Sequence, residues 1–360
     1  MPGELSMAEV LRNMLQYGDL SFRDFMELAL YHPELGYYSR ARSPIGREGD
    51  FITGPSLSPV FAFAIGRLID ELSSRIGGGP STIADIGCGD GSLIHTLYRD
   101  LPETRFFGVD RSLDRVRAAS GVRFVSTLDE LPRDGSHLLL SNELFDAFPF
   151  ARLVRRGEHL HELWVTERDG VLDWAEHEAA PLYDDYFAER GIELLEGQFA
   201  DISPEWAAYY DEMAALVRRG LIVTFDYGFE QKKLFDPRIR RFGTAASYTG
   251  HRVTRDLLAN PGEQDLTAHI NFTDLQRAGE QQGFTTLFFG SQAKFLLALG
   301  ITEHELFSSV LEIEASVELM EKRDEARRLV LPDGIGEDIR VLVQGKGLPL
   351  EGWSFQGLPF

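Results

Sequence analysis

A glycine-rich segment, Asp85-Ile-Gly-Cys-Gly-Asp-Gly, carries the clearest chemical signal in the chain. Gly87, Gly89 and Gly91 stand between a predicted buried strand over 82–86 and a predicted helix over 92–101. Glycines at such a turn let the backbone approach a ligand with no Cβ atom in the way. The spacing is G-x-G-x-G led by an acid, whereas dinucleotide sites use G-x-G-x-x-G. This pattern favours the amino-acid end of S-adenosylmethionine as the ligand.

Asp110 strengthens this interpretation, because it ends the next predicted strand, over 105–110, nineteen residues after Gly91. In doubly wound sheets an acid at this point accepts hydrogen bonds from ribose hydroxyls. We therefore predict that Asp85, the three glycines and Asp110 bind the cofactor. A structural glycine turn followed by a surface aspartate is the simpler alternative.

A second polar segment, Asn142-Glu143-Leu-Phe-Asp146, follows the predicted strand over 137–141 at the edge of the sheet where such folds bind substrates. Methyl transfer is an in-line displacement, so the enzyme positions the nucleophile and handles its proton. Glu143 and Asp146 could grip a guanidinium, and Asn142 could accept a hydrogen bond from an amine. The two carboxylates would share a face if a helical turn begins here. Alternatively, the two carboxylates could only stabilise the N-terminus of a helix through its dipole.

Three further segments are candidates on weaker grounds. The loop containing Gly49-Asp50-Phe51-Ile-Thr53 could fold over the cofactor, and we expect 37–58 to be a mobile cover. Asp226-Tyr-Gly ends another predicted strand at the same sheet edge, and His269 lies in a polar cluster before a helix. Structural turns and helix caps explain these segments equally well. The nine histidines form no pattern typical of a metal site, so we expect no metal.

The elements around these motifs predict an α/β fold. Strands alternate with helices from residue 82 onward, which implies a doubly wound, mostly parallel sheet. The other expected elements are helices over 7–16, 21–31, 57–76, 113–119, 203–219 and 272–282, strands over 122–125, 221–226, 284–290 and 339–344, and a mostly helical 303–329. We expect a helical extension with a lid loop over 1–79 and a Rossmann-like domain over 80–360. That domain would hold a β-rich insertion near 151–200 and a helical one near 292–337.

Composition excludes several classes. The chain has 360 residues with 43% apolar side chains, which is typical of a globular protein. Its 57 acidic against 36 basic residues give a formal charge of -21, which argues against nucleic-acid binding and against anionic membranes. One cysteine and no targeting pattern or long apolar run favour a cytoplasmic protein. The oligomeric state stays open.

Taken together, the segments resemble the MidA-like family of S-adenosylmethionine-dependent methyltransferases, which includes a mitochondrial complex I assembly methyltransferase. The segments that carry the resemblance are 26–38 (M-E-L-A-L-Y-H-P-E-L-G-Y-Y), 49–53, 85–91, 142–149 (N-E-L-F-D-A-F-P), 226–228, 265–272 and 292–301. The resemblance implies a seven-stranded Rossmann-like core with a helical N-terminal extension. It also implies that Asp50, Phe51, Thr53 and His269 belong to the site. For mitochondrial members it implies symmetric dimethylation of an arginine on a complex I subunit.

The chain departs from the family pattern at three places. This chain has Gly54-Pro55-Ser56 where the family has Ser-Pro-Glu, and Ala62-Phe63 where it has Gly-Glu. It has Ile270-Asn271-Phe272 where the family has Val-Asp-Phe. These changes remove acids from the surroundings of the expected site. The main prediction is a methyltransferase acting on an arginine of a protein. A non-catalytic assembly or chaperone-like protein and a small-molecule methyltransferase are the alternatives, and the glycine spacing disfavours a dehydrogenase.

Overall fold

The computed structural model describes residues 6–39, 59–98, 101, 103–117, 120–249, 252–307, 317–331 and 334–356. The chain forms two compact units, which are described separately. Unit 1 comprises 1–51, 145–206 and 229–271, and unit 2 comprises 52–144, 207–228 and 272–360. This division differs from the expected boundary after residue 79. The reason is that Phe22, Phe150 and Leu266, from three distant segments, share one apolar core in unit 1.

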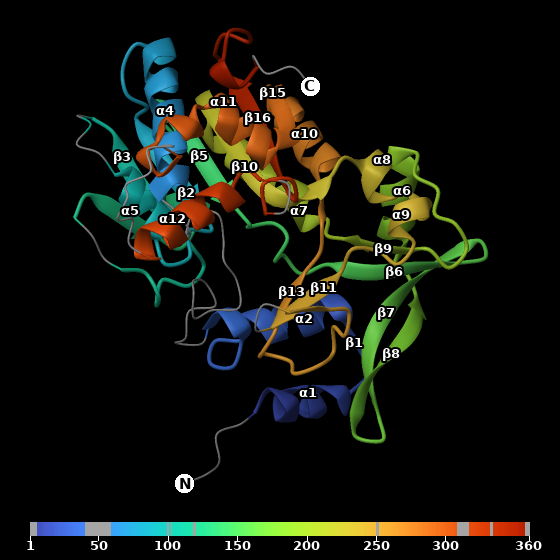
Figure 1. The fold of residues 1–360 in the computed structure, drawn as a ribbon. Coiled ribbons are helices and arrows are strands. Elements are labelled where there is room, and N and C mark those ends of the chain that lie inside the picture. Colours follow the sequence, from blue (N-terminus) through green and yellow to red (C-terminus); the bar gives the residue numbers. More distant parts are fainter. Residues whose placement is uncertain are drawn as a thin grey trace. The chain divides into compact units, whose positions relative to one another are not determined.

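Unit 2 contains the Rossmann-like sheet (Figure 1). Its strands are β2 (Thr82–Ile86), β3 (Arg105–Val109), β4 (Val122–Val125), β5 (Ser136–Asn142), β10 (Arg219–Phe229), β15 (Thr285–Ser291) and β16 (Ile339–Lys346). They lie in the order β15-β16-β10-β5-β2-β3-β4. Strands β4, β3, β2, β5 and β10 are parallel, while β16 is antiparallel to both of its neighbours. The expected α/β architecture is confirmed.

The two faces of this sheet are covered by different helices. Its helices are α4 (Pro59–Ile76), α5 (Ser92–Leu97), α7 (Glu205–Leu216), α10 (Phe272–Gln281), α11 (Gln292–Ala298) and α12 (Val317–Arg328), with short 3-10 turns η2 (Leu128–Glu130), η3 (Ile301–Glu303), η4 (Glu305–Phe307) and η5 (Ser354–Gln356). Alternate residues of the central strands, such as Leu221 and Val223, share a core with α4, α5, α11 and α12. On the opposite face, the Tyr210 hydroxyl of α7 donates to Gln344 Oε1, at 2.8 Å.

Two expected helices differ from the structure. The helix expected over 92–101 ends at Leu97, where the N–H of Tyr98 turns back to the carbonyl of His95. The expectation of a helix over 113–119 is wrong for its described part, 113–117, where there is only a turn. The reason is tertiary, because the N–H of Arg117 donates to the carbonyl of Asp90, at 3.3 Å.

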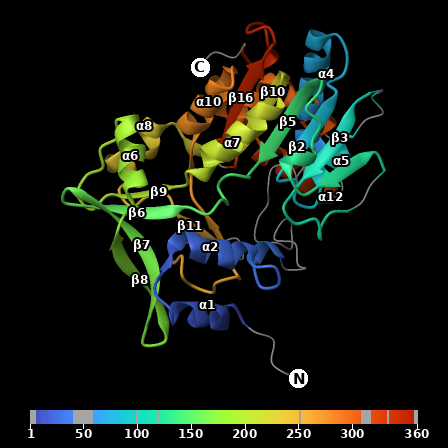
Figure 2. The ribbon, with the colours of Figure 1, turned by 180° about the vertical axis from the view of Figure 1, so that it is seen from behind.

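Unit 1 is built around an antiparallel sheet and the N-terminal helices. Its elements are α1 (Met7–Leu15), β1 (Leu20–Ser21), α2 (Phe22–Tyr31), η1 (Tyr37–Ser39), β6 (Ala151–Arg156), β7 (His159–Arg168), β8 (Val171–Glu178), α6 (Pro181–Arg190), β9 (Phe199–Ile202), α8 (Gln231–Leu234), α9 (Pro237–Arg240), β11 (Ala246–Thr249), β12 (Arg252–Thr254), β13 (Asp265–Thr267) and β14 (Ile270–Asn271). Strands β7 and β8 form the long ribbon seen from both sides in Figures 1 and 2. Sequence patterning missed α6 and the small β12-β11-β13 sheet.

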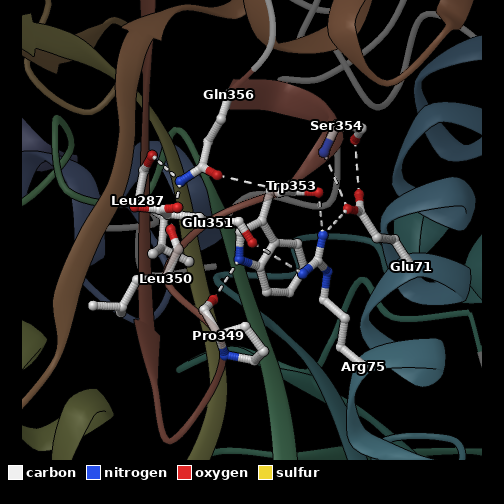
Figure 3. A network of polar contacts seen from close by, with 10 residues as sticks. Glu71, Arg75, Leu287, Pro349, Leu350, Glu351, Trp353, Ser354 and Gln356 are labelled. Atoms are coloured by element: carbon white, nitrogen blue, oxygen red, sulfur yellow. Dashed lines mark hydrogen bonds and ion pairs between the residues drawn. The ribbon is translucent and has the colours of Figure 1, made fainter.

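The segment after β16 is fastened to α4 by a polar and aromatic network (Figure 3). The Arg75 guanidinium stacks on the Trp353 ring, 4.0 Å from its centroid. Glu71 pairs with Arg75 and accepts hydrogen bonds from the N–H and the hydroxyl of Ser354, at 3.0 and 2.7 Å. The C-terminal segment thereby closes one side of the unit 2 core. Among the described residues, no helix is both long and apolar enough to cross a membrane.

A buried ion pair connects four segments of unit 1. Arg152 donates to Asp201 Oδ1 at 2.6 Å, and the Asp201 side chain is fully buried. Asp201 Oδ2 accepts from the N–H groups of Thr244 and Ala245, at 2.6 and 2.8 Å. Thr244 Oγ1 in turn accepts from the N–H of His269, at 3.1 Å. The Asp201 carboxylate therefore fixes the backbone that positions His269.

We predict that Asp201→Asn lowers the free energy of unfolding by about 3 kcal/mol, because it leaves Arg152 without its buried partner. Urea denaturation at neutral pH measures this. Asp236→Asn is the matched control, since Asp236 pairs with the exposed Arg238 and asparagine keeps its N-cap role. Equal midpoints for Asp201→Asn and the unsubstituted protein would contradict the assigned role.

Candidate functional site

The glycine loop of unit 2 joins β2 to α5 and has the geometry of a ligand cradle. Gly87, Gly89 and Gly91 have φ values of +75°, +56° and +79°, a region that residues with a Cβ rarely adopt. The N–H groups of Gly87 and Cys88 donate to the carbonyl of Val109, at 2.8 and 3.0 Å. A Cβ added at Gly91 would lie 2.8 Å from the Phe124 ring. The end of β3 therefore fixes the start of the loop.

Asp85 and Asp110 place two buried carboxyl groups beside this loop. Asp85 is 3% exposed, and its burial together with the negative charges of Asp110 and Asp90 raises its pKa to about 7. Asp110 accepts from the N–H of Gly89 at 2.9 Å and from the N–H of Ser112 at 3.1 Å. Burial nevertheless raises the pKa of Asp110 above its usual range. Both carboxyls would be stabilised by a ligand that brings positive charge or hydroxyl donors.

These features fit the group that the sequence predicts. The amino-acid end of S-adenosylmethionine carries an ammonium group, which suits a buried acid such as Asp85. The loop backbone can approach it because the three glycines have no side chains. Asp110 has the position of a ribose-binding acid at the end of β3. The described residues of the loop are thus compatible with this cofactor.

Asn142 and Glu143 form a constrained turn at the end of β5. Glu143 has φ +50°, which is uncommon for a residue with a side chain. Its N–H donates to the carbonyl of Phe225 at 2.8 Å, and the Asn142 amide donates to Glu143 Oε1 at 3.0 Å. Asn142 Oδ1 is buried with no hydrogen-bond partner among the described residues. Strain and an unsatisfied buried acceptor are typical of functional positions.

Asp226 has a structural role at the end of β10, which is one of the two alternatives that the sequence leaves open. It is fully buried at the end of β10, and its Oδ2 accepts from the N–H of Leu144 at 3.2 Å. Its Oδ1 accepts from the N–H of Tyr227 at 2.8 Å. The other alternative is that Asp226 lines the acceptor site. These two hydrogen bonds stabilise the turn after Glu143.

Asp146 and His269 belong to unit 1, where they are neighbours. The N–H of Ala268 donates to the carbonyl of Asp146 at 3.2 Å. Burial raises the pKa of Asp146 to about 7, and burial together with the charge of Arg240 lowers that of His269 to about 4. The suggested helical turn from Glu143 to Asp146 is absent, because residues 143–150 contain only a turn closed by Phe145 and Phe148. Helical spacing therefore cannot pair the two carboxylates.

A tyrosine of the N-terminal segment contacts Asp265 in the same unit. The Tyr38 hydroxyl donates to Asp265 Oδ1 at 2.9 Å, and the rings of Tyr31 and Tyr38 stack 5.5 Å apart. Asn271, where the family pattern has an acid, is buried and donates to the Tyr186 hydroxyl at 3.0 Å. Asp50, Phe51 and Thr53, together with most of the expected cover, lie outside the described residues.

Comparison with known proteins adds to this geometry. Residues 74–290, more than half of the chain, match a family described as "Putative S-adenosyl-L-methionine-dependent methyltransferase". The protein arginine methyltransferase NDUFAF7 of Danio rerio is 24% identical over 89% of this chain and 82% of its own length. The human protein of that name is 23% identical over 78% of this chain and 70% of its own length. Both are named as mitochondrial.

A solved structure is similar over nearly the whole chain. It is the crystal structure of a Burkholderia thailandensis protein bound to S-adenosyl-homocysteine. The two chains are 27% identical with a TM-score of 0.83, and the match covers 98% of this chain and 94% of the other. The cofactor expected from the glycine loop is therefore confirmed at the level of the family.

We predict that Gly89→Val abolishes measurable binding of S-adenosyl-homocysteine, because a branched side chain would be strained at φ +56° and would occupy ligand space. Isothermal titration calorimetry measures this. Gly77→Val is the control, since Gly77 also has a positive φ, of +80°, but nothing lies within 4 Å of its added Cβ. Similar affinities of the two variants for S-adenosyl-homocysteine would show that the glycine loop does not bind it.

We also predict that the affinity for S-adenosyl-homocysteine falls by about tenfold per pH unit below about pH 7. The raised pKa means that Asp85 becomes neutral as the pH falls through 7, whereas an ammonium group binds its ionised form. Affinity is thus full above pH 7 and lost below it. In Asp85→Asn the pH dependence should shrink and the affinity at pH 8 should fall. A flat profile for the unsubstituted protein would contradict the contact.

Proposed function

The chain belongs to the MidA-like family of S-adenosyl-L-methionine-dependent methyltransferases, and on that premise we propose that it methylates an arginine side chain of a protein. The observation that carries the proposal is the turn after β5. There the N–H groups of Glu143 and Leu144 donate to the carbonyl of Phe225 and the carboxylate of Asp226 on β10, and Glu143 has a strained conformation. The names of the relatives from Danio rerio and human support arginine as the acceptor.

The proposed chemistry assigns a separate task to each group. When bound, the cofactor supplies an electrophilic methyl group on a sulfonium. Glu143 would orient the guanidinium, polarise one nitrogen toward that methyl carbon and accept its proton during or after transfer. Asn142 would orient Glu143 through the 3.0 Å contact between its amide and Oε1. Asp85, Gly87, Gly89, Gly91 and Asp110 would hold the cofactor.

The residues of unit 1 would serve the acceptor. Asp146 would supply a second carboxylate to the guanidinium, and His269, whose pKa is lowered to about 4, would be present as a neutral imidazole at pH 7. Asp50, Phe51 and Thr53 remain part of the proposal by family resemblance. A respiratory complex I subunit is the finer suggestion for the acceptor, and the cytoplasmic location remains a prediction.

We predict that Glu143→Gln lowers the rate of methyl transfer by about a hundredfold or more, because one charge-stabilising and proton-handling contact is lost. Labelled cofactor and a lysate of the host provide the assay, and hydrolysis of the labelled product identifies the methylated residue. Affinity for S-adenosyl-homocysteine should stay nearly unchanged. Glu158→Gln, an exposed change in the turn between β6 and β7, is the control and should have full activity.

Three results would count against the proposal. Normal turnover by Glu143→Gln would show that Glu143 takes no part in methyl transfer. Methyl-lysine or a methylated small molecule in the product, without methyl-arginine, would identify another acceptor class. Cofactor binding without any labelled product would favour the non-catalytic assembly protein.

A further inference from the structure

One segment of unit 1 is basic although the chain as a whole is strongly acidic. Residues 231–241 contain five lysines and arginines and a single acid, Asp236, in a chain whose formal charge is -21. The segment includes α8 and α9, and Ile239 is 55% exposed within it. Such a local reversal of charge is a means of attracting an anionic group that the rest of the surface would repel.

Within this segment the acid is already engaged. Asp236 forms two hydrogen bonds with the Arg238 guanidinium, at 2.9 and 2.6 Å. Arg240 on the same short helix forms no ion pair with any described carboxylate, and its Nε is buried without a hydrogen-bond partner. Arg255, just after β12, likewise forms no ion pair within the described part of the chain. Arg240 and Arg255 thus have no counter-charge among the described residues.

Arg240 lies near His269, a residue of the proposed acceptor site in the same unit. The Arg240 guanidinium lies 5.0 Å from the centroid of the Phe229 ring, and the His269 ring lies 5.5 Å from the same centroid. Burial lowers the pKa of Arg240, and the positive charge of Arg255 lowers it further. The charge of Arg240 in turn lowers the pKa of His269. Two positive charges that repel each other favour an anion between or beside them.

We propose that Arg240 and Arg255 form a binding site for a carboxylate side chain of the protein acceptor, next to His269. This rests on the proposed function, since it makes the site a specificity determinant for the sequence around the target arginine. A carboxylate matches the fork geometry of a guanidinium and would supply the counter-charge that Arg240 and Arg255 lack among the described residues. The acceptor then presents an acid near its target arginine to Arg240 and Arg255.

The first experiment tests the site without methyl transfer. N-acetyl-glutamate α-methylamide, which carries one glutamate side chain, is titrated into the protein while the His269 imidazole is followed by NMR. A carboxylate at Arg240 offsets the positive charge there, so the pKa of His269 should rise. In Arg255→Gln the same rise should need about tenfold more ligand, because one charge-assisted hydrogen bond is lost. Arg238→Gln is the matched control on α9 and should behave as the unsubstituted protein.

The second experiment uses arginine-centred nonapeptides in which one glutamate is moved through the flanking positions, with a glutamine series for comparison. Dissociation constants are measured in the presence of S-adenosyl-homocysteine. At one or more positions glutamate should bind about tenfold tighter than glutamine, and this preference should vanish in Arg240→Gln and Arg255→Gln. A third series carries phosphoserine in place of glutamate. A preference for phosphoserine without a preference for glutamate would indicate a phosphate site and would contradict the proposal.

The outcomes separate the two proposals. An unchanged His269 titration in the unsubstituted protein, or an equal response in Arg255→Gln, overturns the carboxylate site whatever the enzyme methylates. A responsive His269 together with a glutamate preference supports the site. If His269 responds but the labelled product contains no methyl-arginine, the arginine proposal fails while the carboxylate site stands.

Discussion

The candidate residues of unit 2 depend on hydrogen bonds that connect the end of one parallel strand to the turn after its neighbour. The turn after β2 donates to the carbonyl of Val109 on β3, and the turn after β5 donates to the carbonyl of Phe225 on β10. These bonds hold Glu143 at φ +50°, a conformation that costs about 1 kcal/mol or more for a residue with a side chain. Asp226 adds a second anchor at Leu144. The sheet register therefore determines where these polar groups point.

Most of this arrangement could be predicted because it is encoded locally. The glycines after β2 and the alternation of strands and helices follow from residue type and spacing, so β2 and β4 have the expected bounds. The failures have tertiary causes. The described residues 113–117 lack the expected helix because the N–H groups of Ser112 and Arg117 donate to the Asp110 carboxylate and the Asp90 carbonyl.

Unit 1 was harder to predict, since its contacts join residues far apart in the chain. Three separate segments contribute Arg152, Asp201 and Thr244. No local sequence pattern predicts that these residues together position His269. The basic run at 231–241 was missed for a different reason. A formal charge of -21 describes the average surface, whereas recognition depends on local charge, and the average concealed a segment of opposite sign.

Burial shifts the two titratable groups beside the proposed acceptor site in opposite directions. It raises the pKa of Asp146 to about 7 and contributes to lowering that of His269 to about 4, so in each case the neutral form is favoured. A permanently charged carboxylate in this position would cost several kcal/mol in lost hydration. A cationic guanidinium arriving beside Asp146 would reverse the balance and favour ionisation. The negative charge that holds the acceptor is then generated by the acceptor itself, so a neutral ligand of similar shape would find an uncharged carboxyl and gain no such attraction.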